Sequence, residues 1–176
     1  RGARQPEFTH LDLEMSFVHR DDVLKLVEDL FTAMLPEVAL HKRLLSSPWP
    51  KLSYTQALER FGSDKPDMRV PLVLTELTDV MKDVEFKVFR EAAQKPGGRV
   101  AALRVPAGGE LSRKEIDDYT SFVAIYGAKG LAYIKVNALE KGLEGLQSPI
   151  LKFLPETVIK VILERTGAKD GDLIFF

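Results

Sequence analysis

Strand and helix signals alternate at short intervals from about Leu74 to the last residue of the chain. Strands are predicted for "VEFKVF" (84–89), "RVAALRV" (99–105), "LAYIKV" (131–136) and, after a turn, "DGDLIFF" (170–176), because β-branched and aromatic residues are concentrated there. Helical spacing of apolar residues predicts helices over 112–126, 148–154 and 155–167. This alternation predicts an α/β or α+β fold for roughly the last hundred residues.

Sequence signals for helix ends support two of these helices. Ser112 and Glu115 form an S-x-x-E capping box at the start of the first. Pro155 stands near the first position of the last helix, and Gly167 stands where that helix should stop.

The beginning of the chain follows a different pattern. In "RQPEFTHLDLEMSF" (4–17) polar and apolar residues alternate, which predicts a strand whose apolar face, Leu11 to Phe17, is buried. A helix is predicted from Asp21 to Met34, and Pro36 is expected to end that helix or the turn after it. The opposite face of the predicted strand carries Asp12 and Glu14, and a solvated surface is the default interpretation of two such carboxylates.

A short helix and a polar loop follow. "YTQALERF" (54–61) is predicted to be helical, with Ser53 as its cap and Gly62 as its stop. The next segment, "GSDKPDMR" (62–69), carries four charges and could bind a polar ligand. On composition alone a solvated loop is again favoured.

Composition excludes several classes of protein. The net charge of −1 gives no overall electrostatic reason to expect nucleic acid, although a local basic patch stays possible. The absence of cysteine excludes disulfides and thiolate metal sites, and the three histidines are too scattered for a metal site. No apolar run is long enough to cross a bilayer, and no signal-peptide pattern or phosphate-binding loop is present. The pattern therefore indicates a two-part α/β protein, with a boundary near Leu77.

Longer stretches of sequence resemble a known family. "RQPEFTHLDLEMSF" resembles the second half of motif 2 in bacterial-type aspartyl-tRNA synthetases, R-Q-P-E-F-T-x-[IL]-D-x-E, and "GSDKPDMR" resembles a loop of the same class II enzymes. Later segments resemble the GAD domain inserted into their catalytic core, a unit that also occurs in a tRNA-dependent amidotransferase subunit. These segments are "GRVAALRVP", "SRKEIDDY", "YGAKGLAYIKVN", "GLEG", "SP", "KFL" and "DGDLIFF".

This resemblance implies a domain plan and a function. Residues 1–76 would be a partial class II catalytic core built on an antiparallel sheet, and residues 77–176 a small α/β inserted GAD-like domain with a return strand. The parent enzyme would be an aspartate–tRNA ligase that activates aspartate with ATP and Mg²⁺ and transfers it to tRNA(Asp). It would be a cytoplasmic homodimer with no membrane partner.

The resemblance also implies roles for three side chains. Gln5 matches a glutamine that contacts ATP, and Asp12 matches an aspartate that organises the amino-acid pocket. Glu14 would support that pocket from behind. "RGAR" (1–4) departs from the more usual R-A-D-R, with Ala3 in place of an acid.

Several parts of the family pattern are absent from the sequence. The F-R-D-E arginine, the flipping loop, motif 3 and the anticodon-binding domain do not occur in it. We therefore expect a central slice of the enzyme that contains no catalytic residue or metal ligand and is inactive alone. The alternative is a free-standing GAD-like module that binds tRNA or protein.

Overall fold

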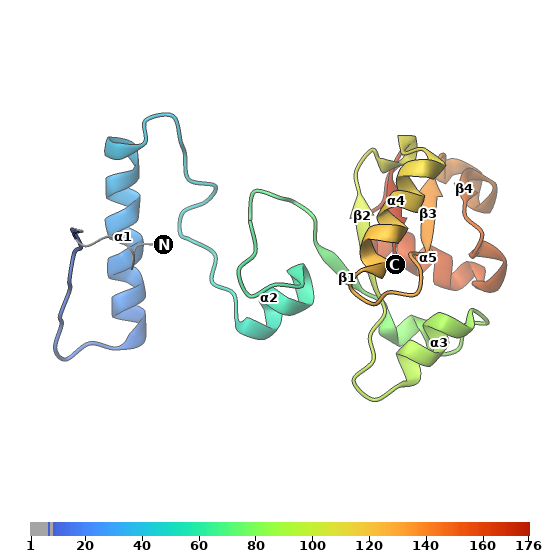
Figure 1. The fold of residues 1–176 in the computed structure, drawn as a ribbon, viewed down its shortest axis with the longest axis horizontal. Coiled ribbons are helices and arrows are strands. Elements are labelled where there is room, and N and C mark those ends of the chain that lie inside the picture. The colour runs from blue at the N-terminus through green and yellow to red at the C-terminus, as the bar shows by residue number, and fades with distance from the viewer. Residues whose placement is uncertain (1–6, 8) are drawn as a thin grey trace. The chain divides into compact units, whose positions relative to one another are not determined.

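The computed structural model describes residue 7 and residues 9–176 (Figure 1). The chain folds into two compact units, unit 1 with residues 1–51 and unit 2 with residues 52–176. The assignment of residues 1–76 to a catalytic core and of 77–176 to an inserted domain stays a prediction. Within the described part of the chain, no helix is both long enough and apolar enough to cross a membrane.

Helix α1 (Arg20–Val38) dominates the described part of unit 1. Asp22 stabilises its start, because its carboxylate accepts a hydrogen bond of 2.8 Å from the His19 backbone N–H. The chain after the helix turns back towards it. The backbone N–H of Trp49 donates to Glu28 Oε1 at 2.7 Å, and the ring centroids of Trp49 and Phe31 lie 6.1 Å apart. No side chain of α1 is fully buried.

The strand predicted for residues 4–17 is wrong within the described residues. Residues 9–15 have no regular secondary structure. The apolar side chains expected to be buried are instead exposed: Leu11 by 68%, Leu13 by 51% and Phe17 completely. An extended segment needs a neighbouring strand for its N–H and C=O groups, and the described part of unit 1 contains no strand.

Unit 2 is built on a five-stranded sheet in which every pair is antiparallel. The strands are β1 (Leu74–Glu76), β2 (Ala101–Val105), β3 (Tyr133–Val136), β4 (Leu146–Gln147) and β5 (Leu173–Phe175). Their order across the sheet is β1-β2-β5-β3-β4, so the last strand lies in the middle. The predicted α/β fold class is confirmed, as are the strands predicted within 99–105, 131–136 and 170–176.

The helices of unit 2 are α2 (Tyr54–Phe61), α3 (Lys87–Gln94), α4 (Arg113–Ala124) and α5 (Glu156–Thr166). The predicted caps of α2 and α4 are confirmed, since Ser53 Oγ accepts from Gln56 N and Ser112 Oγ accepts from Glu115 N. The chain leaves α5 through Gly167 in the left-handed conformation, as predicted. The helix predicted for 148–154 is only a 3₁₀ turn at Leu151–Phe153.

The strand predicted for 84–89 is also wrong, because α3 begins within this segment. Val84, Phe86 and Val88 alternate with polar residues, which suggested a strand. In the structure Val88 is 64% exposed, whereas Phe89 and Ala93, four residues apart, are buried. Helical spacing therefore places Phe89 and Ala93 on the buried face of α3.

The two faces of the sheet are covered unequally. On one face Ala102, Ile134 and Ile174 belong to a large core that includes residues of α3 and α5. On the other face Leu173 and Phe175 form a small cluster with Ile116 of α4. Side chains at the β1–β2 side of this second face therefore border pockets rather than a closed core.

A buried carboxylate ties the central strand to its neighbours. Asp172, directly before β5, accepts hydrogen bonds from Arg104 Nε (2.6 Å), Ala107 N (3.0 Å) and Lys169 N (2.8 Å). Burial alone would raise its pKa, but these hydrogen bonds and the Arg104 charge outweigh burial and hold the pKa below its usual value. Asp172 is therefore ionised in the folded protein at neutral pH.

Candidate functional site

The loop that contains "GSDKPDMR" follows α2 and forms one wall of a pocket. Gly62 ends the helix with a positive φ of 68°, a conformation that glycine adopts at little cost. The backbone N–H of Lys65 then donates to Ser63 Oγ at 3.1 Å, which closes a tight turn. The Gly62 conformation and this hydrogen bond together hold the start of the loop at the end of α2.

The second half of the loop is held by an ion pair between neighbouring side chains. Arg69 Nε lies 2.8 Å from Asp67 Oδ1, and Arg69 Nη2 lies 2.6 Å from Asp67 Oδ2. Together with a further hydrogen bond from the Arg69 backbone, this guanidinium lowers the pKa of Asp67 to about 2. Asp67 is therefore charged throughout the physiological pH range.

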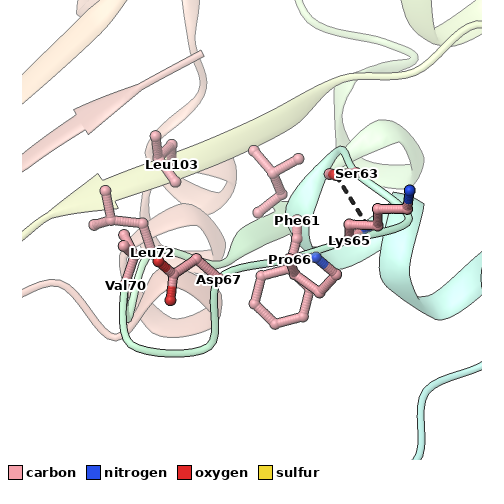
Figure 2. A pocket seen from close by; sticks show the side chains of 9 residues that line it. Phe61, Ser63, Lys65, Pro66, Asp67, Val70, Leu72 and Leu103 are labelled. Atoms are coloured by element: carbon pink, nitrogen blue, oxygen red, sulfur yellow. Dashed lines mark hydrogen bonds between the residues drawn. The ribbon is translucent and has the colours of Figure 1, made fainter. Parts of the chain in front are cut away.

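The pocket beside this loop has a volume of about 310 Å³ (Figure 2). Phe61, Leu72, Leu74 and Leu103 supply an apolar lining, and the loop supplies the polar side chains. Figure 2 shows Ser63 and Lys65 on one side and Asp67 on the other. The size is at the lower end of the range for small-ligand pockets, about 300–1,000 Å³.

The charged side chains of this pocket differ in what they offer a ligand. The Lys65 ammonium makes no hydrogen bond or ion pair with the described residues, so it is available to an anionic group. Asp67 is already satisfied by Arg69. Among the residues that line the pocket there is no nucleophile beside a general base, the pair that covalent catalysis requires.

The site residues suggested by the resemblance lie elsewhere in the chain. Gln5 lies outside the described residues. Asp12 and Glu14 are exposed and belong to unit 1, and Asp12 Oδ2 lies 3.2 Å from His10 Nε2. The structure thus describes Asp12 as an accessible carboxylate, and its role stays a prediction.

A metal site is not apparent in the described residues, because no three or more carboxylate, histidine or cysteine side chains converge there. We therefore assign no Mg²⁺ ligand.

Sequence reasoning missed the apolar wall of the pocket. Leu103 lies in a predicted strand, and Leu74 lies at the point where the character of the sequence changes, but no local signal brings the two together. They become neighbours because β1 pairs with β2 in the register that sets Leu74 opposite Leu103. Such a register depends on residues far apart in the chain.

Comparison with known families identifies the larger unit. The family model for the GAD domain matches residues 89–176, which is half of the 176-residue chain. The chain belongs to the GAD domain family. The match contains strands β2 to β5 together with α4, α5 and most of α3, whereas β1 and the pocket loop precede it.

Membership in this family supports part of the expectation drawn from sequence. GAD domains are found in class II aminoacyl-tRNA synthetases such as the aspartyl enzymes, so a ligase context is supported.

Proposed function

We propose that this chain is part of an aspartate–tRNA ligase, consisting of a partial catalytic core followed by the inserted GAD domain. The main support is the GAD match at residues 89–176. It is strengthened by the two segments that precede it, "RQPEFTHLDLE" and "GSDKPDMR", which resemble motifs of that enzyme in the expected order.

In this proposal Asp12 binds the substrate through charge. Its side chain is 86% exposed, so a substrate ammonium or a neighbouring basic side chain of the complete enzyme can reach it. Gln5 contacts ATP through an amide, which donates and accepts without adding charge beside a triphosphate. Glu14 supports Asp12 from behind.

The reaction of the parent has two steps. Aspartate attacks the α-phosphate of ATP to give aspartyl-adenylate and pyrophosphate, and the terminal ribose of tRNA(Asp) then accepts the aspartyl group. Positioning and charge stabilisation carry such catalysis, with no protein nucleophile. Mg²⁺ would stabilise phosphate charge, and a cytoplasmic homodimer is the expected form of the parent.

Kinetics of the full-length protein test this proposal. Asp12→Asn keeps the shape of the side chain and removes its charge, so aspartate-dependent pyrophosphate exchange should fall about ten- to more than a hundredfold. Asp21→Asn, at an exposed carboxylate in the first turn of α1, is the matched control and should leave the rate unchanged. Gln5→Ala should raise the KM for ATP more than that for aspartate.

A wild-type rate in the Asp12→Asn enzyme, or no aspartate-dependent exchange by the full-length protein, would overturn the proposal. The 176-residue chain by itself should show no exchange. Robust exchange by it would equally contradict this interpretation.

A free-standing binding module is the second candidate. It is favoured by unit 2, which has its own sheet and hydrophobic core. The full-length protein would then bind tRNA or a protein partner without any aminoacylation. The coding sequence on either side of this stretch would distinguish the two candidates directly, because motifs 1 and 3 should flank a synthetase fragment.

A further inference from the structure

A second pocket, which we call the α3 pocket, lies between α3 and the segment that leads into β3. Its volume is about 500 Å³. Phe86, Val88 and Phe89 line it from the start of α3, and Phe176 lines it from the end of the chain. It lies largely within the region that matches the GAD domain, and its lining residues do not include those to which the family resemblance gives a role.

The aromatic lining of the α3 pocket is held in place by its own packing. The Phe86 and Phe89 rings meet edge to face, with centroids 4.7 Å apart, and the Phe89 and Phe176 rings lie 5.4 Å apart. A backbone hydrogen bond of 2.9 Å from Phe176 N to Ala132 O fixes the last residue. Phe86 and Phe176 are only partly buried, so part of each ring stays accessible to a ligand.

Two cations complete the α3 pocket, and none of the described residues that line it is acidic. Two hydrogen bonds hold Arg99: Nε donates to Glu76 Oε2 at 2.7 Å and Nη2 donates to the Glu59 carbonyl at 2.6 Å, while Nη1 has no partner among the described residues. Lys129 is exposed and makes no hydrogen bond or ion pair with the described residues. Since Glu76 offsets the charge of Arg99, Lys129 supplies most of the attraction for an anion.

We propose that the α3 pocket binds one unpaired nucleotide of an RNA chain, with the base against Phe86 and Phe176 and the phosphate at Lys129 and Arg99. Aromatic faces beside cations are the arrangement that holds single-stranded nucleic acid. An acyl chain would need an enclosed tunnel, whereas Val88 and Lys129 at this pocket are exposed. The choice of RNA as the ligand rests on the proposed function in tRNA aminoacylation.

Binding of short RNA to the full 176-residue chain tests this inference. The probe is a fluorescein-labelled, unstructured RNA of seven nucleotides, followed by fluorescence anisotropy at several salt concentrations. Lys129→Glu should weaken binding and reduce the slope of log K against log salt by about 0.7, the value for one lost single-strand phosphate contact. Lys141→Glu, which reverses an exposed lysine that does not line the pocket, should change the affinity far less.

A pair of phenylalanine variants separates stacking from folding. Phe86 and Phe153 stack on each other with centroids 5.7 Å apart, but only Phe86 lines the pocket. Phe86→Leu should therefore weaken RNA binding about 5- to 100-fold, whereas Phe153→Leu should bind RNA with the wild-type affinity. Both variants should change the thermal midpoint by a similar amount, because each removes one ring of the same stacked pair. The same RNA annealed to its complement should bind more weakly, because its bases are already stacked and paired.

Equal losses in the two lysine variants or in the two phenylalanine variants would overturn the inference. So would undiminished binding of the duplex, absence of RNA binding, or an equally tight complex with free AMP, which would identify a nucleotide site instead. The proposed function has a separate readout, pyrophosphate exchange by the full-length enzyme, so either idea can fail alone.

Discussion

Replacing Asp172 with alanine should lower the free energy of unfolding of unit 2 by about 3–5 kcal/mol. The side chain is 5% exposed, and its two oxygens accept three hydrogen bonds that join β5 to the end of β2 and to the turn before β5. Truncation leaves two backbone N–H groups without an acceptor, each worth about 1–3 kcal/mol. It also leaves the Arg104 guanidinium, which is 27% exposed, without its partner.

The two units carry separate spectroscopic probes, which makes the effect assignable. The single tryptophan, Trp49, belongs to unit 1, whereas the sheet belongs to unit 2. In urea unfolding of the full chain, Asp172→Ala should shift the transition followed by NMR signals of backbone amides in β2, β3 and β5, and it should leave the tryptophan fluorescence transition in place. Asp172→Asn should lower the free energy of unfolding less, by about 1.5–3 kcal/mol, because an amide oxygen in the position of Oδ2 can still accept from Arg104 Nε and Lys169 N.

The pH dependence of stability gives an independent test of the same carboxylate. The pKa of Asp172 is lowered in the folded state, so its contribution is fully present above the unfolded value of about 3.9 and is lost as pH falls through the folded pKa. The difference in stability between wild type and Asp172→Ala should therefore shrink below about pH 4. A difference under 1 kcal/mol at pH 7, or one that does not change with pH, would refute the reasoning.

Three further predictions concern folding. Residues 52–176 expressed alone should show slowly exchanging amides in the central strands, and residues 77–176 should show weaker protection because they lack β1. Leu13→Ala in this chain should change the urea midpoint of the tryptophan transition very little, because Leu13 is half exposed, whereas in the complete enzyme a buried leucine would cost about 2–5 kcal/mol. Gly145→Ala should destabilise unit 2 by about 1–3 kcal/mol in urea unfolding, because the new Cβ would lie 1.7 Å from the Ala138 carbonyl oxygen.

The sequence predicted those elements of unit 2 whose signals are local. The cap at Ser53 and the capping box at Ser112 identified the starts of two helices, and Gly167 identified the end of a third. Each of these signals is a hydrogen bond or a backbone preference within a few residues, so no tertiary information is required.

Prediction from the sequence failed where a segment fits both strand and helix spacing, and where a strand forms only if another strand is there to pair with it. In residues 84–89 alternation and helical spacing are both present, and only the burial of Phe89 and Ala93 selects the helix. The alternation from Leu11 to Phe17 does not suffice for a strand, because the described part of unit 1 offers no strand to pair with it. The pocket beside the 62–69 loop likewise depends on the β1–β2 register, which no local pattern specifies.

The position of β5 in the middle of the sheet has a consequence for synthesis on the ribosome. Strands β1 and β2 pair directly, as do β3 and β4, but only β5 joins these two halves. As a nascent chain emerges, each half can form while its inner edge stays unpaired, and the sheet closes only when residues 173–175 arrive. Until then those edges are open to pairing with other chains, so slow translation just before this segment would prolong the period of risk for aggregation.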